Sequence, residues 1–204
     1  MGRDYRSLPV DVPTAFLQSQ FGQDRFVITA TDHARGGTYC DIGAGEPWHL
    51  SNTLALEKGL EWSGIHCDLE WHDAHKKQRS PLLNFADAFA VDWRKALAAI
   101  SIGGRIDFLS LDLEPPSRTE DVLRMMPLED FRFSIICVEH DAYRDGGKER
   151  RDRMRALIEN HGYELIGTAG INGLDIDDFW VDPAAIDADR LRADLDAHFA
   201  KVTP

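Results

Sequence analysis

Acidic side chains follow five apolar runs of the sequence, each at the point where a strand is predicted to end. These runs end at Asp41, at Asp68, at Asp87, at Asp112 and Glu114, and at Glu139, His140 and Asp141. Carboxylates in such places accept hydrogen bonds from ligand hydroxyl or amino groups, bind hard cations or take up a proton. Each acid alone is as readily a helix N-cap, but five in succession favour a ligand site.

The segment GAGEPWHL, residues 43–50, follows the first run and has the glycine pattern of a nucleotide-binding turn. A dinucleotide site requires a third glycine, and its pyrophosphate lies at a helix N-terminus. Here Trp48 stands at the third glycine position, and Glu46 places a negative charge where the phosphates would lie. The turn therefore favours a nucleoside-type ligand without phosphates. S-adenosylmethionine is such a ligand, and its cationic part suits neighbouring acids.

Two of the strand-end acids suit the adenosine part of this cofactor. We expect Asp68 to accept hydrogen bonds from both ribose hydroxyls, although dinucleotide enzymes also carry an acid after their second strand. Asp87 would accept a hydrogen bond from the adenine amino group, beside the backbone N–H of Ala88. The predicted cofactor-binding residues are Asp41, Gly43, Ala44, Gly45, Asp68, Leu69, Asp87 and Ala88.

The acids of the fourth and fifth runs suit a methyl acceptor. Methyl transfer requires an aligned nucleophile, and a hydroxyl nucleophile must also lose its proton. The predicted catalytic residues are Asp112, Glu139 and His140, with His140 as the general base that the carboxylates orient. Alternatively, Asp112, Glu139 and Asp141 bind a divalent cation such as Mg²⁺, which lowers the pKa of the acceptor. A third interpretation makes His140 and Asp141 caps of the following segment.

These side chains require a sheet that brings successive strand ends together. Strands are predicted at residues 37–45, 62–69, 81–88, 106–114, 131–140, 163–170 and 177–183, and helices at 49–60, 70–79, 91–100, 117–126, 147–162 and 184–202. The alternation predicts an α/β fold with a doubly wound, mostly parallel seven-stranded sheet and helices on both faces, in three layers. One of the last two strands is predicted to be antiparallel. Residues 1–204 are predicted to form a single domain, with residues 1–25 as an N-terminal arm.

Three polar features receive local structural interpretations. Ser117 followed by Glu120 predicts an N-cap with an acid three residues later. His72 and His75 lie on a predicted helix without a zinc motif around them, so a solvated helix face is favoured. The basic segment KERRDRMR, residues 148–155, is interleaved with acids and is also interpreted as a solvated helix face.

Composition limits the classes of partner and the compartment. The net charge of −12 and the pI of about 5.0 argue against a general nucleic-acid-binding protein. The sequence has neither an apolar signal core nor an apolar run of membrane-spanning length, which predicts a cytoplasmic protein without membrane contact. Cys40, Cys67 and Cys137 lie in apolar runs and are predicted to be reduced core thiols. The expected partner is a small-molecule substrate.

The chain resembles the FkbM family of S-adenosylmethionine-dependent methyltransferases. The resemblance spans most of the sequence and is carried by SQFGQD (19–24), YCDIGAG (39–45), LSNTLALEKGLEWSGIHCDLE (50–70), IDFLSLDLE (106–114), FRFSIICVEHDAYR (131–144), HGYELIG (161–167) and DDFWV (177–181). It implies a seven-stranded class I methyltransferase fold and methyl transfer to an oxygen, often a hydroxyl of a sugar or natural product.

The chain departs from the family pattern at two places. The family has an Asp-Gly-like continuation after the glycine turn and reads Asp-Val-Glu-Gly after strand four, whereas this chain has Glu46-Pro47-Trp48 and DLEPPS. These departures concern substrate recognition most. A cofactor-binding module of the same fold without turnover, or methylation of another class of acceptor, is the alternative. A nicotinamide-dependent oxidoreductase is disfavoured by Glu46 and Trp48.

Overall fold

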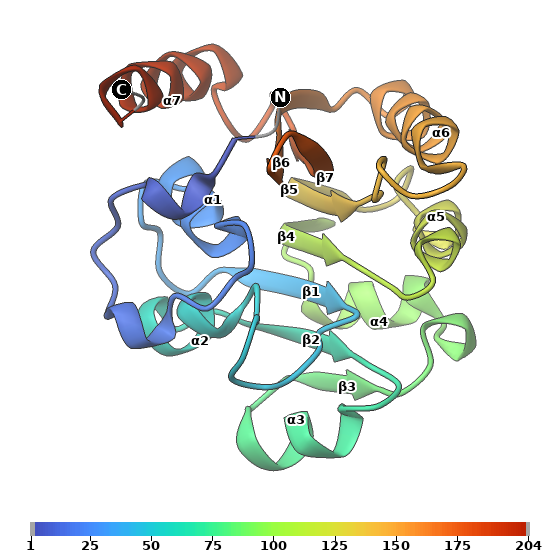
Figure 1. Ribbon diagram of the computed structural model, residues 1–204. Helices are drawn as coiled ribbons and strands as arrows, with labels where there is room; N and C mark the ends of the chain where they lie inside the picture. The colour runs from blue at the N-terminus through green and yellow to red at the C-terminus, as the bar shows by residue number, and fades with distance from the viewer. Residues whose placement is uncertain (1–2, 203–204) are drawn as a thin grey trace.

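A central sheet of seven strands forms the middle layer of the structure, a computed structural model that describes residues 3–202 (Figure 1). The strands are β1 (Thr38–Ile42), β2 (Ser63–Cys67), β3 (Leu83–Phe85), β4 (Arg105–Leu111), β5 (Arg132–Glu139), β6 (Glu164–Ile171) and β7 (Leu174–Val181). Their order across the sheet is β3-β2-β1-β4-β5-β7-β6, and β7 pairs antiparallel with both of its neighbours. The predicted seven-stranded, mostly parallel sheet with an antiparallel strand near its end is confirmed.

The turn between β6 and β7 explains this antiparallel strand. Asn172 and Gly173 have φ angles of 54° and 81°, in the left-handed region that a two-residue hairpin turn requires. Asn and Gly are the residues that adopt this conformation most readily. The hairpin places β7 between β5 and β6, so that Asp177 of β7 pairs with Glu139 of β5.

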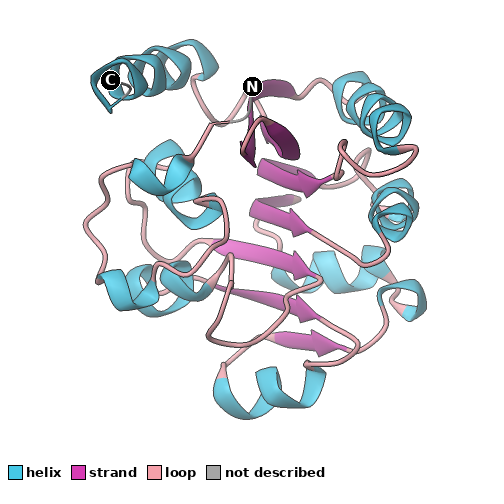
Figure 2. Ribbon diagram, in the orientation of Figure 1, coloured by secondary structure: helices cyan, strands magenta, loops and turns pink. Residues whose placement is uncertain are grey.

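Helices cover both faces of the sheet (Figure 2). They are α1 (Gln23–Ala30), α2 (Leu54–Leu60), α3 (His72–Gln78), α4 (Trp93–Ile100), α5 (Pro116–Met125), α6 (Gly147–Asn160) and α7 (Ala188–Val202). Short 3-10 helices lie at η1 (Tyr5–Ser7), η2 (Thr14–Phe16) and η3 (Ala88–Ala90). One buried cluster joins α1, α2 and α7 to the sheet through Phe26, Leu56 and Leu195, and a second joins α4 and α6 to the opposite face through Trp93 and Ile158.

The N-terminal segment packs into the first of these clusters. Tyr5 is fully buried, and its ring lies 5.5 Å from that of Phe26 and 4.6 Å from that of Phe179. The segment continues into α1, a helix that the sequence analysis did not predict. The assignment of residues 1–204 to one domain stays a prediction, and residues 1, 2, 203 and 204 lie outside the part that the structure describes.

Two helix starts differ from the prediction. α2 begins at Leu54 rather than at residue 49, so residues 46–53 form a loop after the glycine turn. The N-cap of α5 is Pro115, without a capping side chain, and Ser117 lies inside the helix. Proline suits the first helical position because its φ is already helical, and Pro116 occupies that position here. The predicted serine cap is therefore wrong.

Glu120 has a different partner from the one predicted. Its carboxylate accepts hydrogen bonds from Arg153 of α6 at 2.6 and 2.8 Å and from Arg124 at 2.7 Å. This acid therefore links α5 to α6 instead of closing a helix end. The three cysteines are free and buried, as predicted. Within residues 3–202, no helix combines the length and apolar character that crossing a membrane requires.

Candidate functional site

The carboxyl ends of the parallel strands lie at one edge of the sheet (Figure 1). The register pairs Ile42 at the end of β1 with Cys67 of β2 and with Leu111 of β4. Leu111 in turn pairs with Val138 of β5. The acids that follow these strands therefore meet at this edge, where ligands bind in open α/β sheets.

The glycine turn is pressed against the end of β4. Gly43 has a φ of 80°, and a Cβ atom there would overlap the carbonyl oxygen of Asp112. Backbone hydrogen bonds from Gly43 N to Cys67 O, 2.8 Å, and from Asp112 N to Ile42 O, 2.9 Å, hold the turn in this place. Gly45 has a φ of 60° but faces open space. The turn thus joins the predicted cofactor site to the predicted acceptor site.

The loop of residues 46–53 is held by a buried arginine. Arg79, which follows α3, donates hydrogen bonds to the carbonyl of Pro47 at 2.8 Å and to the hydroxyl of Ser51 at 3.1 Å. Its Nε donates to Glu57 of α2 at 2.9 Å. The sequence analysis missed Arg79, because its partners lie 22 to 32 residues away in the chain.

His75 supports the same turn, so the predicted solvated position of this histidine is wrong. Its ring is fully buried, its Nε2 lies 2.8 Å from the carbonyl oxygen of Gly45, and its centroid lies 4.2 Å from the ring of His66. Burial lowers the pKa of His75, which favours a neutral ring that donates Nε2–H to Gly45. His72, three residues earlier, is partly exposed.

Asp68 contacts the glycine turn directly. Its Oδ2 accepts a hydrogen bond from Gly45 N at 3.0 Å, and its Oδ1 accepts from Glu70 N at 2.9 Å and from Trp71 N at 2.6 Å. A carboxylate offers about four acceptor positions, so one position on Oδ2 is left for a ligand hydroxyl. Asp68 therefore shapes the turn and has acceptor capacity beside it.

The other predicted cofactor residues lie in different surroundings. Asp41 is buried beneath the turn, where its carboxylate accepts a hydrogen bond from Thr53 at 2.8 Å and burial raises its pKa. Leu69 is 71% exposed. Asp87 is exposed and caps η3 by accepting from Phe89 N at 3.0 Å, whereas Ala88 is buried. Asp41 thus supports the 46–53 loop, while Leu69 and Asp87 lie at the surface of the strand-end edge.

A small pocket lies at the ends of β4 and β5, beside β7. Its lining consists of Gln23, Asn52, Ser110, Leu111, Asp112, Cys137, Val138, Glu139 and Asp177. Asp112 and Glu139 are hydrogen-bonded to each other, which requires a proton between the two carboxyl groups. Burial and the neighbouring Asp112 raise the pKa of Glu139 to about 12. The sequence analysis predicted that Asp112, Glu139 and His140 act together, and the pocket lining contains the first two but not His140.

Of the residues that line the pocket, only Asp112 and Glu139 were predicted as site residues, and the missed ones include Asp177 and Gln23. Asp177 of β7 is buried, accepts a hydrogen bond from Gln23 Nε2 at 2.6 Å, and has a pKa that burial and Asp112 raise well above its usual range. The signal for Asp177 was present in the alternation of DDFWV, because consecutive strand residues face opposite sides of a sheet. Gln23 had no such signal, since α1 was not predicted.

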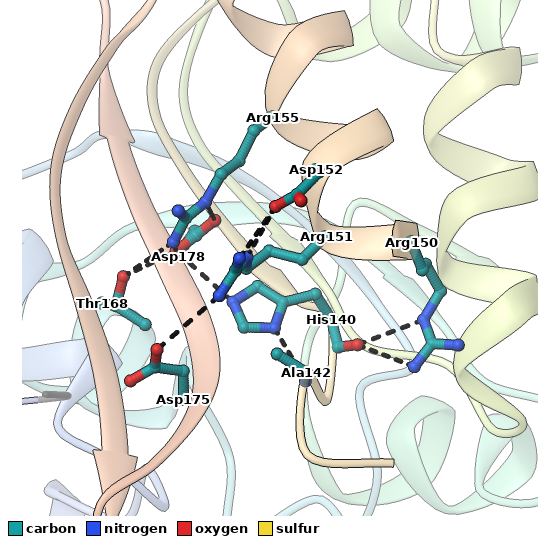
Figure 3. A network of polar contacts seen from close by, with 9 residues as sticks. All are labelled: His140, Ala142, Arg150, Arg151, Asp152, Arg155, Thr168, Asp175 and Asp178. Carbon is teal, nitrogen blue, oxygen red and sulfur yellow. Dashed lines mark hydrogen bonds and ion pairs between the residues drawn. The ribbon is translucent and has the colours of Figure 1, made fainter. Parts of the chain in front are cut away.

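His140 lies on the opposite face of the sheet from this pocket. Its ring is buried beside α6, with Nδ1 accepting from Ala142 N at 3.1 Å and Nε2 3.4 Å from Asp178 Oδ1 (Figure 3). Arg155 donates two hydrogen bonds to Asp178, at 2.7 and 2.8 Å. The pocket lining does not include His140. This position does not suit a base that must reach an acceptor hydroxyl. It favours the alternative interpretation, in which His140 caps the segment that follows β5.

The basic segment 148–155 is only partly solvated. Arg150 is buried and donates to the carbonyl oxygen of His140 at 2.8 and 3.1 Å (Figure 3). Arg155 reaches Asp178 on β7. The interpretation of this segment as a solvated face is therefore wrong for these two residues, which tie α6 to the strand ends.

The predicted metal ligands meet in a different combination. Within residues 3–202, ligand atoms of Glu114, Glu139 and Asp141 lie within 4.8 Å of one another, and Asp112 does not belong to this group. Carboxylate oxygens suit a hard cation such as Mg²⁺. However, Arg144 already contacts Glu114 at 2.8 and 3.0 Å and Asp141 at 2.6 Å. The residues present therefore do not fit a metal ion in this arrangement.

Comparison with known proteins bears on the fold. No family model matches the sequence, and no curated protein matches it. Among solved structures, an O-methyltransferase from Bacillus cereus in complex with SAH has a TM-score of 0.53 and 15% identity, with 87% of this chain and 85% of that chain covered. A protein assigned as an O-methyltransferase from Klebsiella pneumoniae has a TM-score of 0.51 and 16% identity, with 88% and 86% covered.

A protein assigned as an rRNA-methylase from Clostridium thermocellum has a TM-score of 0.50 and 15% identity, with 80% of this chain and 97% of that chain covered. At these identities the likeness concerns the fold alone. Membership of the FkbM family stays a prediction. The strand order, the antiparallel β7 and these structural neighbours together establish that the chain has the class I methyltransferase fold.

Proposed function

We propose that this protein is an S-adenosylmethionine-dependent methyltransferase that acts on a hydroxyl of a small molecule of the sugar or natural-product type. The observation that carries the proposal is the glycine turn followed by a loop. α2 begins only at Leu54, so the chain does not run from Gly45 directly into a helix, and Glu46 is exposed beside the turn. A pyrophosphate therefore lacks the backbone N–H donors of a helix that usually follow such a turn. An adenosine with a cationic side arm instead finds carboxylates that accept hydrogen bonds and balance its charge.

The cofactor residues divide into supporting and contacting groups. Asp68 is the proposed acceptor for one ribose hydroxyl, through the position left on Oδ2, and Asp87 with the Ala88 backbone is the proposed adenine contact. Gly43, Ala44 and Gly45 are the proposed backbone contacts of the ligand, and Gly43 has no room for a side chain because it packs against the Asp112 carbonyl oxygen. Asp41 and Leu69 complete the predicted set, with Asp41 acting through the loop that Thr53 belongs to.

The Asp112–Glu139 pair is the proposed acceptor of one proton. When bound, S-adenosylmethionine supplies a methyl group on a sulfonium centre, and the chain must align the acceptor oxygen and remove its proton. The two carboxyl groups line the pocket next to the glycine turn, and with one shared proton they keep one negative charge. This charge can take up the proton of an acceptor hydroxyl within hydrogen-bond distance. His140 and Arg150 hold the backbone that carries Glu139.

Two other functions remain as alternatives. A cofactor-binding module without turnover would use the same Asp68 and glycine turn, and only the Asp112–Glu139 pair in a pocket favours an enzyme. Methylation of a nucleic acid, the activity assigned to one structural neighbour, is disfavoured by the net charge of −12. The O-directed reaction is favoured by the resemblance to the FkbM family.

A labelled methyl donor tests the proposal. We expect transfer from S-adenosyl-[methyl-³H]methionine to at least one member of a panel of sugars and hydroxylated natural products. Asp112→Asn should lower kcat by about 10²–10⁴-fold, the range for a lost proton acceptor, with unchanged affinity for S-adenosylhomocysteine. Asp121→Asn, an exposed acid of α5, serves as the matched control. Normal turnover by Asp112→Asn contradicts the assigned role, and cofactor binding without any transfer favours the module.

A further inference from the structure

One guanidinium group connects the segments that follow β4 and β5, the strands whose ends line the candidate acceptor site. Arg144 Nη1 and Nη2 donate to the two carboxylate oxygens of Glu114 at 3.0 and 2.8 Å, and its Nε lies 2.6 Å from Asp141 Oδ2. Nε also donates to the Tyr143 hydroxyl at 3.2 Å. The contact joins the segment after β4 to the turn after β5, the two segments that flank the pocket.

The turn of residues 141–144, which follows β5, carries Arg144. Asp141 has a φ of 46°, in the left-handed region that non-glycine residues rarely adopt. Arg144 N donates to Asp141 O at 3.0 Å, which closes the turn. Arg150 donates to the Asp141 carbonyl from α6 at 3.3 Å. These hydrogen bonds hold the backbone of the turn from which the Arg144 side chain extends.

The oxygens that Arg144 contacts are those that a divalent cation would need. Glu114, Glu139 and Asp141 are the three acids whose ligand atoms come together, and Arg144 contacts two of them directly. The Asp141 side chain is only 2% exposed, so its charge needs a partner inside the protein. A bidentate guanidinium–carboxylate contact is among the stronger charged hydrogen bonds, and it satisfies both oxygens of Glu114.

We propose that the positively charged Arg144 guanidinium occupies the place between Glu114 and Asp141 that Mg²⁺ or Mn²⁺ would take. Methyl transfer at this site therefore needs no divalent metal. The statement that methyl transfer needs no metal rests on the proposed methyltransferase function. The statement that Arg144 keeps a divalent cation from these acids does not. Arg144 fixes the two segments beside the Asp112–Glu139 pair and reduces the negative charge around it. A cation gains access to these carboxylates only when the guanidinium is removed.

Titration with Mn²⁺, followed by the electron paramagnetic resonance signal of the free ion, tests this directly. Wild-type protein should bind Mn²⁺ only weakly, and Arg144→Gln should bind one ion at least about tenfold more tightly, because removing a positive charge a few ångströms away favours a cation. Arg144→Lys, which keeps the charge, should remain close to wild type. Arg124→Gln is the matched control, because Arg124 pairs with Glu120 on α5 and lies outside the acid group.

A second substitution locates the ion. Glu114→Gln introduced into Arg144→Gln should abolish the gained affinity. The wild-type titration does not depend on the folding of any variant, and tight Mn²⁺ binding by the wild type would overturn the proposal. An affinity of Arg144→Gln equal to that of the wild type would overturn it as well. Absence of S-adenosylmethionine binding would instead reject the proposed function and leave the metal result standing.

Discussion

Replacing Gly43 by alanine tests whether the glycine turn and the end of β4 are rigidly joined. The residue has a φ of 80°, so alanine there costs about 1–2 kcal/mol in backbone strain. The added Cβ would also overlap the Asp112 carbonyl oxygen, which is backbone and cannot rotate away. Overpacking of this kind costs a further ~1–3 kcal/mol. We therefore expect Gly43→Ala to lower the free energy of unfolding by about 2–5 kcal/mol.

Gly45→Ala is the matched control for this prediction. Gly45 belongs to the same turn and has a φ of 60°, but nothing lies near the position of an added Cβ. Only the backbone strain of about 1–2 kcal/mol applies. Urea denaturation followed by far-ultraviolet circular dichroism measures both free energies. An equal loss of unfolding free energy in the two variants would refute the predicted overlap with Asp112, because backbone strain alone would then explain the effect of Gly43→Ala.

The remaining predictions concern two buried charged groups. Burial raises the pKa of Asp178, but hydrogen bonds from Arg155 and His140 hold it at about 2. Its carboxylate should therefore contribute about 2 kcal/mol of stability that is present above the unfolded-state pKa of about 3.9 and lost as the pH falls towards 2. Urea midpoints of wild type and Asp178→Asn should converge over that range, and a constant difference would contradict the assignment. Arg79→Gln should lower the free energy of unfolding by about 1–3 kcal/mol, because buried acceptors lose a charged donor while Lys58 and Tyr39 still contact Glu57. The exposed Lys76→Gln should change it by less than about 0.5 kcal/mol. Similar effects of these two changes would argue against a structural role for Arg79.

Local sequence patterns were sufficient for the sheet. Apolar runs separated by helical periodicity located all seven strands, and the lack of a helix before DDFWV predicted the antiparallel one. These features depend on neighbours along the chain, which a sequence displays directly. The start of α2 at Leu54 was missed because SNT and the residues before it are anchored by Arg79, a contact that no local pattern reveals.

The candidate site was predicted by position but not by side-chain direction. Asp112 and Glu139 face one pocket, and strand alternation then turns His140 to the other face, where Asp178 receives it. The sequences VEH (138–140) and DDF (177–179) already place neighbouring polar residues on opposite faces of the sheet. This pattern argues against His140 as a general base in the same pocket as Glu139. The burial of His75 and Arg150 could not be read, because it depends on which face of each helix meets the sheet.

Titration calorimetry with S-adenosylmethionine, S-adenosylhomocysteine and NAD tests the central claim most directly. We expect the first two to bind with dissociation constants on the order of micromolar and NAD not to bind. Asp68→Asn, which keeps one side-chain oxygen, should weaken binding by about 1–3 kcal/mol, whereas Asp73→Asn, an exposed acid of α3, should leave it unchanged. Binding of NAD in place of the two sulfur compounds, or an unaltered affinity in Asp68→Asn, would contradict the proposed cofactor site.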